Sequence, residues 1–63
     1  MKATNRNFEG TFAEYKAYVR LYLETTGAPE CYDEEVIIGA WDEEQDGIGA
    51  AIECKDEYAR QSH

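Results

Sequence analysis

Carboxylates are the commonest side chains in this sequence that are capable of chemistry. Most of them fall in or near two runs, Asp33-Glu34-Glu35 and Asp42-Glu43-Glu44. A carboxylate pair works as acid and base only when desolvation raises the pKa of one partner, and charged residues in runs are mostly solvated. The single histidine is His63, the last residue, at a position where fraying is the rule. The sequence therefore predicts a protein that is not an enzyme.

A segment from Asp42 to Glu53 resembles the calcium loop of the EF-hand family. Acidic residues fall on ligating positions of that loop, and Gly47 falls on its sharp turn. The ligands that the resemblance implies are Asp42, Glu44, Asp46 and Glu53. The segment departs from the family at Gly49, where an aliphatic residue is usual, and at Glu44, where a shorter side chain is usual. A solvated acidic turn, with no metal and no cofactor, is the alternative and the one that we expect.

Charge is distributed unevenly along the chain. Fourteen acidic residues against six basic ones give a net charge of −8. Residues 1–23 carry +2, residues 24–57 carry −11, and Arg60 adds a further positive charge. Such a field repels nucleic acid and anionic membranes and attracts basic protein surfaces. We therefore expect the partner to be a larger protein with a basic surface, without direct contact to nucleic acid or to a membrane.

An acidic surface in the second half of the chain is the predicted binding site. Carboxylates three or four residues apart on a helix lie roughly 5–6 Å from each other, a spacing comparable with that of nucleic-acid phosphates. In size, charge and lack of catalytic residues, the chain resembles small acidic phage and plasmid proteins that block host nucleic-acid-binding proteins. We therefore predict an inhibitor of this type, a nucleic-acid mimic in its sharpest form. The alternative is an acidic face that only keeps the protein soluble. The charged residues of the predicted surface are Asp33, Glu34, Glu35, Asp42, Glu43, Glu44 and Asp46.

Aromatic residues offer a second kind of contact. Tyr32 falls in a loop, where exposed tyrosines often anchor interfaces, and Trp41 is either a core residue or a second anchor. An alternative function is a structural or accessory subunit that docks through a tyrosine-rich helix, with Tyr18 and Tyr22 in contact with the assembly. A homodimer is a further possible assembly.

Cysteine usage and hydropathy indicate the compartment. Cys31 and Cys54 each stand alone, and we expect two buried free thiols, with a disulfide between them as the alternative. The first ten residues contain no apolar core of a signal peptide, and nowhere are there about eighteen consecutive apolar residues. These features predict a cytoplasmic protein.

The elements that must position these residues begin with a helix after Thr11. Thr11 and Glu14 form a capping-box pattern, and Gly27 followed by Pro29 ends the helix. Residues 1–10 are expected to be partly frayed, although Phe8 is placed to fold back onto the helix. The three- and four-residue spacing of apolar residues predicts one buried face, formed by Phe12, Tyr15, Val19, Tyr22 and Leu23.

The second half of the chain fits two secondary structures. With Asp33 as N-cap, a helix buries Val36, Ile37, Ala40 and Trp41, and a third helix from about Gly49 to Gln61 buries Ile52 and Tyr58. Alternatively, residues 36–41 and 48–54 form a β-hairpin. Neither run alternates polar with apolar residues, as a half-exposed hairpin requires. We therefore predict a mainly α, small three-helix domain over residues 1–63, with one helix packed on a β-hairpin as the α+β alternative.

Overall fold

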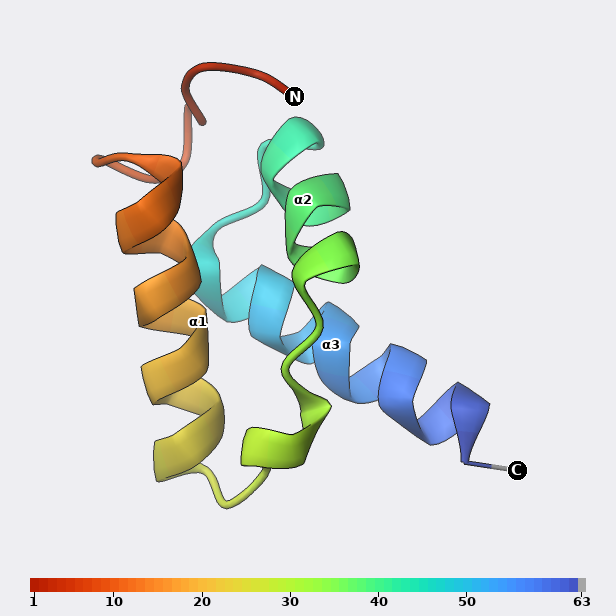
Figure 1. Ribbon diagram of the computed structural model, residues 1–63. Helices are drawn as coiled ribbons and strands as arrows, with labels where there is room; N and C mark the ends of the chain where they lie inside the picture. Colours follow the sequence, from red (N-terminus) through yellow and green to blue (C-terminus); the bar gives the residue numbers. More distant parts are fainter. Residues whose placement is uncertain (63) are drawn as a thin grey trace.

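The computed structural model describes residues 1–62, which form three α-helices and a short 3₁₀ turn (Figure 1). Helix α1 spans Phe12–Thr25, the turn η1 spans Pro29–Cys31, α2 spans Glu34–Asp42 and α3 spans Gly47–Gln61. The prediction of a mainly α, three-helix domain is confirmed. Residues 36–41 and 48–54 lie in α2 and α3, so the β-hairpin alternative is wrong.

Each helix begins at a side chain that accepts a backbone N–H bond. Thr11 Oγ1 accepts from the Glu14 N–H at 3.2 Å, and Glu14 Oε1 accepts from the Thr11 N–H at 2.8 Å, which completes a capping box. Asp33 caps α2, and Asp46 Oδ1 accepts from the Gly49 N–H at 2.7 Å to cap α3. These bonds satisfy N–H groups that have no partner inside the helix. Because Asp46 is the cap, α3 begins two residues earlier than expected.

The core forms where α1 meets the other two helices. The buried side chains of α1 and α2 are Tyr15, Val19, Leu23, Ile37, Ala40 and Trp41. The faces predicted for these helices are confirmed, and their remaining members, Phe12, Tyr22 and Val36, are partly buried against the core. The Trp41 and Tyr15 rings meet edge-on with centroids 4.9 Å apart, and Phe8 folds back onto Tyr15 at 5.0 Å. Full burial of one large apolar side chain contributes roughly 1.5–3 kcal/mol.

Helix α3 packs through its small residues. It buries Gly47, Ala50, Ala51 and Cys54. Ile52 and Tyr58 are 50% and 44% exposed, so the prediction that they are buried is wrong. The reason is the close approach of α1, because a Cβ atom at Gly47 would overlap the ring of Tyr18. The distance between packed helices depends on the side chains at their contact, and a row of isoleucines would hold the two helices apart.

The N-terminal segment, residues 1–10, packs on the end of α2 (Figure 1). Asn5 is 5% exposed, and its Nδ2 donates to the carbonyl oxygens of Gln45 at 2.8 Å and of Trp41 at 3.4 Å. The Trp41 indole N–H donates to the Lys2 carbonyl oxygen at 2.7 Å. The expectation that this segment is partly frayed is corrected, because its polar groups complete hydrogen bonds that the end of α2 leaves open.

Both cysteines are buried free thiols, so the disulfide alternative is wrong. The Cys54 sulfur lies 3.8 Å from the Asp33 carbonyl oxygen. Burial raises the pKa of the Cys54 thiol. The thiol is therefore held in its neutral form. No helix of residues 1–62 has both the length and the apolar character that a membrane crossing requires.

Candidate functional site

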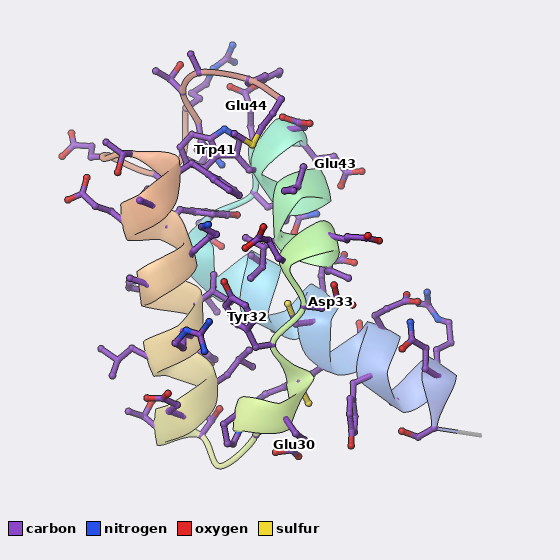
Figure 2. All side chains as sticks on the ribbon, in the orientation of Figure 1. Glu30, Tyr32, Asp33, Trp41, Glu43 and Glu44 are labelled. Atoms are coloured by element: carbon purple, nitrogen blue, oxygen red, sulfur yellow. The ribbon has the colours of Figure 1, made fainter. Side chains whose placement is uncertain are left out.

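Six acidic side chains lie along η1 and α2, and the sequence from Pro29 to Glu43 contains no basic residue. We call these residues the acidic strip: Glu30, Asp33, Glu34, Glu35, Asp42 and Glu43. Figure 2 shows Glu30 on η1, Asp33 at the start of α2 and Glu43 near the other end of α2. The strip therefore follows η1 and α2 from Glu30 to Glu43, with Glu34 turned towards Lys16 of α1.

The outward face of α2 carries Glu35 and Asp42, of which Asp42 also accepts the Lys2 backbone N–H at 2.7 Å. Glu35 and Asp42 are seven residues apart, which is about 10 Å along a helix axis. No Lys or Arg side chain within residues 1–62 forms an ion pair with Glu35, Asp42 or Glu43. Gly39 lies between Glu35 and Asp42, and a Cβ atom there would meet no other atom within 4 Å. This face thus combines negative charge with an uncovered stretch of helix backbone.

Five of the seven acids predicted to bind a partner also serve the fold, and three of them do so at the helix starts or against α1. Asp33 and Asp46 cap α2 and α3. The Glu34 carboxylate lies 3.3 Å from Lys16 Nζ on α1, and the two side chains are 56% and 31% exposed. An exposed pair of this kind contributes roughly 0–1 kcal/mol. These carboxylates are partly committed to contacts within the molecule.

Glu44 and Asp42 hold the N-terminal segment at the corner where α2 turns into α3. Glu44 has a φ of 59°, and its carboxylate accepts the Arg6 backbone N–H at 3.2 Å and lies 3.5 Å from Lys2 Nζ. Asp42 Oδ1 accepts the Lys2 backbone N–H at 2.7 Å. The Arg6 N–H bond, helped by the charges of Lys2 and Arg6, lowers the pKa of Glu44 against the opposing effect of desolvation. Glu44 is therefore a charged group of the fold.

The two aromatic residues predicted as anchors lie in different environments. Trp41 is fully buried against Tyr15 and donates to the Lys2 carbonyl oxygen, so its assignment as a surface anchor is corrected. Tyr32 is partly exposed, and the guanidinium of Arg20 lies over its ring at 4.0 Å. This cation–π contact holds the tyrosine ring in place at the edge of the strip.

Residues 42–53 do not form a calcium loop. Gly47, expected at a sharp turn, is the first residue of α3, and Glu53 lies further along the same helix. The Asp46 carboxylate caps α3, and the Glu44 carboxylate binds the N-terminal segment. Within the part of the chain that the structure describes, no three Asp, Glu, Cys or His side chains are placed to share a metal ion. The EF-hand resemblance is therefore one of sequence and not of ligand geometry.

Sequence reasoning missed an apolar surface between α1 and α3. Four large side chains on this surface are 42–60% exposed: Tyr18, Leu21, Ile48 and Ile52. The sequence did contain a signal for this surface. Ile48 and Ile52 are four residues apart, so they share one face of a helix, and the small residues between them form the neighbouring face. Of the four residues, only Ile52 was predicted to be buried, and Tyr18 was predicted to contact an assembly; the core positions of α3 are taken by smaller residues.

Comparison with known proteins gives no match to a family model, to a curated protein or to a solved structure. No pocket opens among residues 1–62. His63, the only histidine, lies outside the described residues. Function is therefore inferred from the two surfaces, the acidic strip and the apolar surface.

Proposed function

We propose that this protein is a small acidic binding domain whose acidic strip docks onto a basic surface of a larger protein. The observation that carries the proposal is the outward face of α2, where Glu35, Gly39 and Asp42 follow one another in a segment without basic residues. Charges in such an arrangement speed the encounter with a basic surface and select its orientation. In this function the domain occupies its partner and catalyses nothing.

Gly39 supports a close approach of the partner to α2. A glycine inside a helix costs about 0.5–1 kcal/mol relative to alanine. The fold does not require this glycine, because its φ is not positive and a Cβ atom would meet open space. A bare stretch of backbone between two carboxylates lets Lys or Arg side chains of a partner reach both of them.

The sharpest form of the proposal is nucleic-acid mimicry. Glu35 and Asp42 lie on one face of α2, about two helical turns apart. Such a surface suits a groove lined by Lys and Arg that otherwise holds phosphates. The partner is then a nucleic-acid-binding protein, and the domain inhibits it by occupying that groove.

The test compares two charge reversals of equal size. Glu35→Lys changes the strip, and Glu9→Lys changes an exposed acid before α1. A partner is first captured from a lysate on the immobilised domain, and its association rate is then measured at increasing salt. We expect the wild-type rate to fall steeply with salt, Glu35→Lys to slow association by about tenfold, and Glu9→Lys to change it little.

Equal effects of the two variants, or a rate that is independent of salt, would contradict docking through the strip. A duplex DNA oligonucleotide added as competitor separates the two forms of the proposal. It displaces the domain from its partner if the domain is a mimic. It leaves the complex intact if the basic surface is not a nucleic-acid site.

A further inference from the structure

We infer that the apolar surface between α1 and α3 is a second docking site, which receives an amphipathic helix of a partner protein that carries Lys or Arg beside its apolar face. The surface consists of Tyr18, Leu21, Ile48 and Ile52, and it shares no residue with the acidic strip. The inference goes beyond the proposed function because it assigns a separate site with a different recognition chemistry.

The four residues form one patch and are not scattered single side chains. The Tyr18 ring contacts Gly47, the first residue of α3, and Ile48 follows directly. Ile52 lies one turn further on the same side of α3, and Leu21 lies one turn from Tyr18 on α1. Lys55 continues the row of Ile48 and Ile52, and its Nζ lies 5.7 Å from the centre of the Tyr22 ring on α1. That contact shows which side of α3 borders α1.

The fold leaves about half of each isoleucine of this patch exposed. Helix α3 is already packed through its small residues, and Ile48 and Ile52 remain 42% and 50% exposed beside them. Leu21 is 60% exposed on α1 although the buried residues of that helix, such as Val19, are fully enclosed. Single exposed apolar side chains are ordinary, whereas a patch that spans two helices marks an interaction surface.

The shape of the patch favours a helix as its occupant. Two neighbouring helices each contribute residues three or four positions apart, and such rows form ridges that another helix packs between. Recognition of this kind places apolar residues of the incoming helix at three- and four-residue spacing. The part of the chain that the structure describes has no β-sheet whose edge would bind an extended peptide instead.

The charge around the patch favours a basic helix over a second copy of this chain. Glu24 lies three residues after Leu21, Asp56 lies four residues after Ile52, and both acids are exposed. Neither forms an ion pair within residues 1–62, and the basic residue of the row, Lys55, is drawn over the Tyr22 ring. Two copies would each bring a net charge of −8 to the contact. Lys or Arg flanks on a partner helix meet the free acids instead.

The probe for this site is a synthetic amphipathic helical peptide with leucines on one face and lysines on both sides of it. A second peptide has glutamates in place of the lysines. We expect the lysine peptide to bind the wild-type protein and Ile48→Ser/Ile52→Ser to weaken its binding by about tenfold or more, as for the loss of interface anchors. Leu21→Ser tests the same surface from α1, and Met1→Ser, at a residue 71% exposed, is the matched control.

Circular dichroism and the melting temperature show whether each variant is folded. If Ile48→Ser/Ile52→Ser does not fold, peptide binding by Leu21→Ser tests the surface independently. Equal binding of the lysine and glutamate peptides overturns the inference, and so does unchanged binding by the Ser variants. A dimer that sedimentation detects and that Ile52→Ser dissociates also overturns it in favour of a second copy. If Glu35→Lys loses peptide binding while the Ser variants keep it, the peptide binds to the acidic strip. That last result leaves the proposed function standing while this inference fails.

Discussion

The corner between α2 and α3 and the outward face of α2 contain the same type of side chain in different roles. At the corner, the carboxylates of Glu44 and Asp46 accept backbone N–H bonds from Arg6 and Gly49. On the outward face, the Glu35 carboxylate has, among residues 1–62, neither an ion-pair partner nor a free N–H group to cap. The difference shows that the role of a carboxylate depends on which backbone donors lie within reach. Net charge alone therefore does not identify a docking surface.

Asn5 is the residue whose substitution should destabilise the corner between α2 and α3 most. Its Nδ2 donates to the carbonyl oxygens of Gln45 and Trp41, and its Oδ1 accepts the Asn7 N–H at 2.7 Å. Asn5→Ala should lower the free energy of unfolding by about 2–3 kcal/mol, because three hydrogen bonds of a buried amide are lost together, at roughly 1 kcal/mol each. The Gln45 and Trp41 carbonyl oxygens keep Tyr15 Oη and the Glu44 N–H as donors. Urea unfolding followed by circular dichroism measures this loss, and Thr4→Ala, at an exposed residue of the same segment, is the control. Equal stability of Asn5→Ala and the wild type would show that the N-terminal segment does not support the corner.

Two glycine substitutions compare the corner with the outward face directly. Gly47→Ala adds a Cβ atom that overlaps Tyr18, and overpacking of this kind should cost about 2 kcal/mol. Gly39→Ala adds the same atom in open space and should stabilise the protein by about 0.5–1 kcal/mol. Chemical denaturation of both variants gives the two values. If both substitutions changed the free energy of unfolding in the same direction, the close contact of α1 with α3 would not be the reason for a glycine at position 47.

Tyr15 links the corner to α1 through its phenol. Its Oη donates to the carbonyl oxygens of Gln45 at 2.8 Å and Asp46 at 3.2 Å, and Tyr15→Phe should lose about 1 kcal/mol at neutral pH. Burial, helped by the Asp46 charge, raises the pKa of Tyr15 from 10.0 to about 12. The fold favours the neutral phenol, so this contribution is complete below pH 10 and is lost between pH 10 and 12. Stability measured across that range should fall less in Tyr15→Phe than in Tyr58→Phe, an exposed control; parallel curves would contradict this.

The smallest expected effect is the contribution of Glu44 to stability at low pH. Its pKa lies below the ordinary value of 4.5, so the stability that its charged form supplies is present above that pH and is lost as the pH falls through the lowered pKa. Glu44→Gln should therefore flatten the acid side of a plot of unfolding midpoint against pH. Glu43→Gln, on the outward side of the same turn, should leave the curve unchanged. A flattening in Glu43→Gln alone would reverse the roles assigned to the two residues.

Local signals in the sequence identified much of the helical framework. Thr11, Glu14 and Asp33 were recognised as caps because each side chain reaches an N–H group within three residues of itself. Asp46 was missed as a cap because Asp-Gly also favours a turn. The buried face of α3 was missed because apolar periodicity gives weight to large residues, whereas the space between close helices admits small ones.

Contacts between distant parts of the chain could not be predicted from the sequence. Asn5 and Lys2 meet residues that lie 36–40 positions away, and no local pattern encodes such a pairing. Contacts of the same long range, from Arg6 and Lys2, explain why Glu44 was assigned to the binding surface although it serves the corner. Of the predicted docking residues, Glu35 and Glu43 need no such correction, because their surroundings are set by α2 itself and by the turn after it.

The hydrogen bond from the Trp41 indole to the Lys2 carbonyl oxygen supplies a built-in optical reporter. Trp41 is the only tryptophan of the chain, and it lies beneath the N-terminal segment with its ring against Tyr15. When that segment detaches, water reaches the indole, and its fluorescence emission shifts to longer wavelength. A single unlabelled fluorophore therefore distinguishes local opening at the corner from unfolding of the helices, which circular dichroism follows separately.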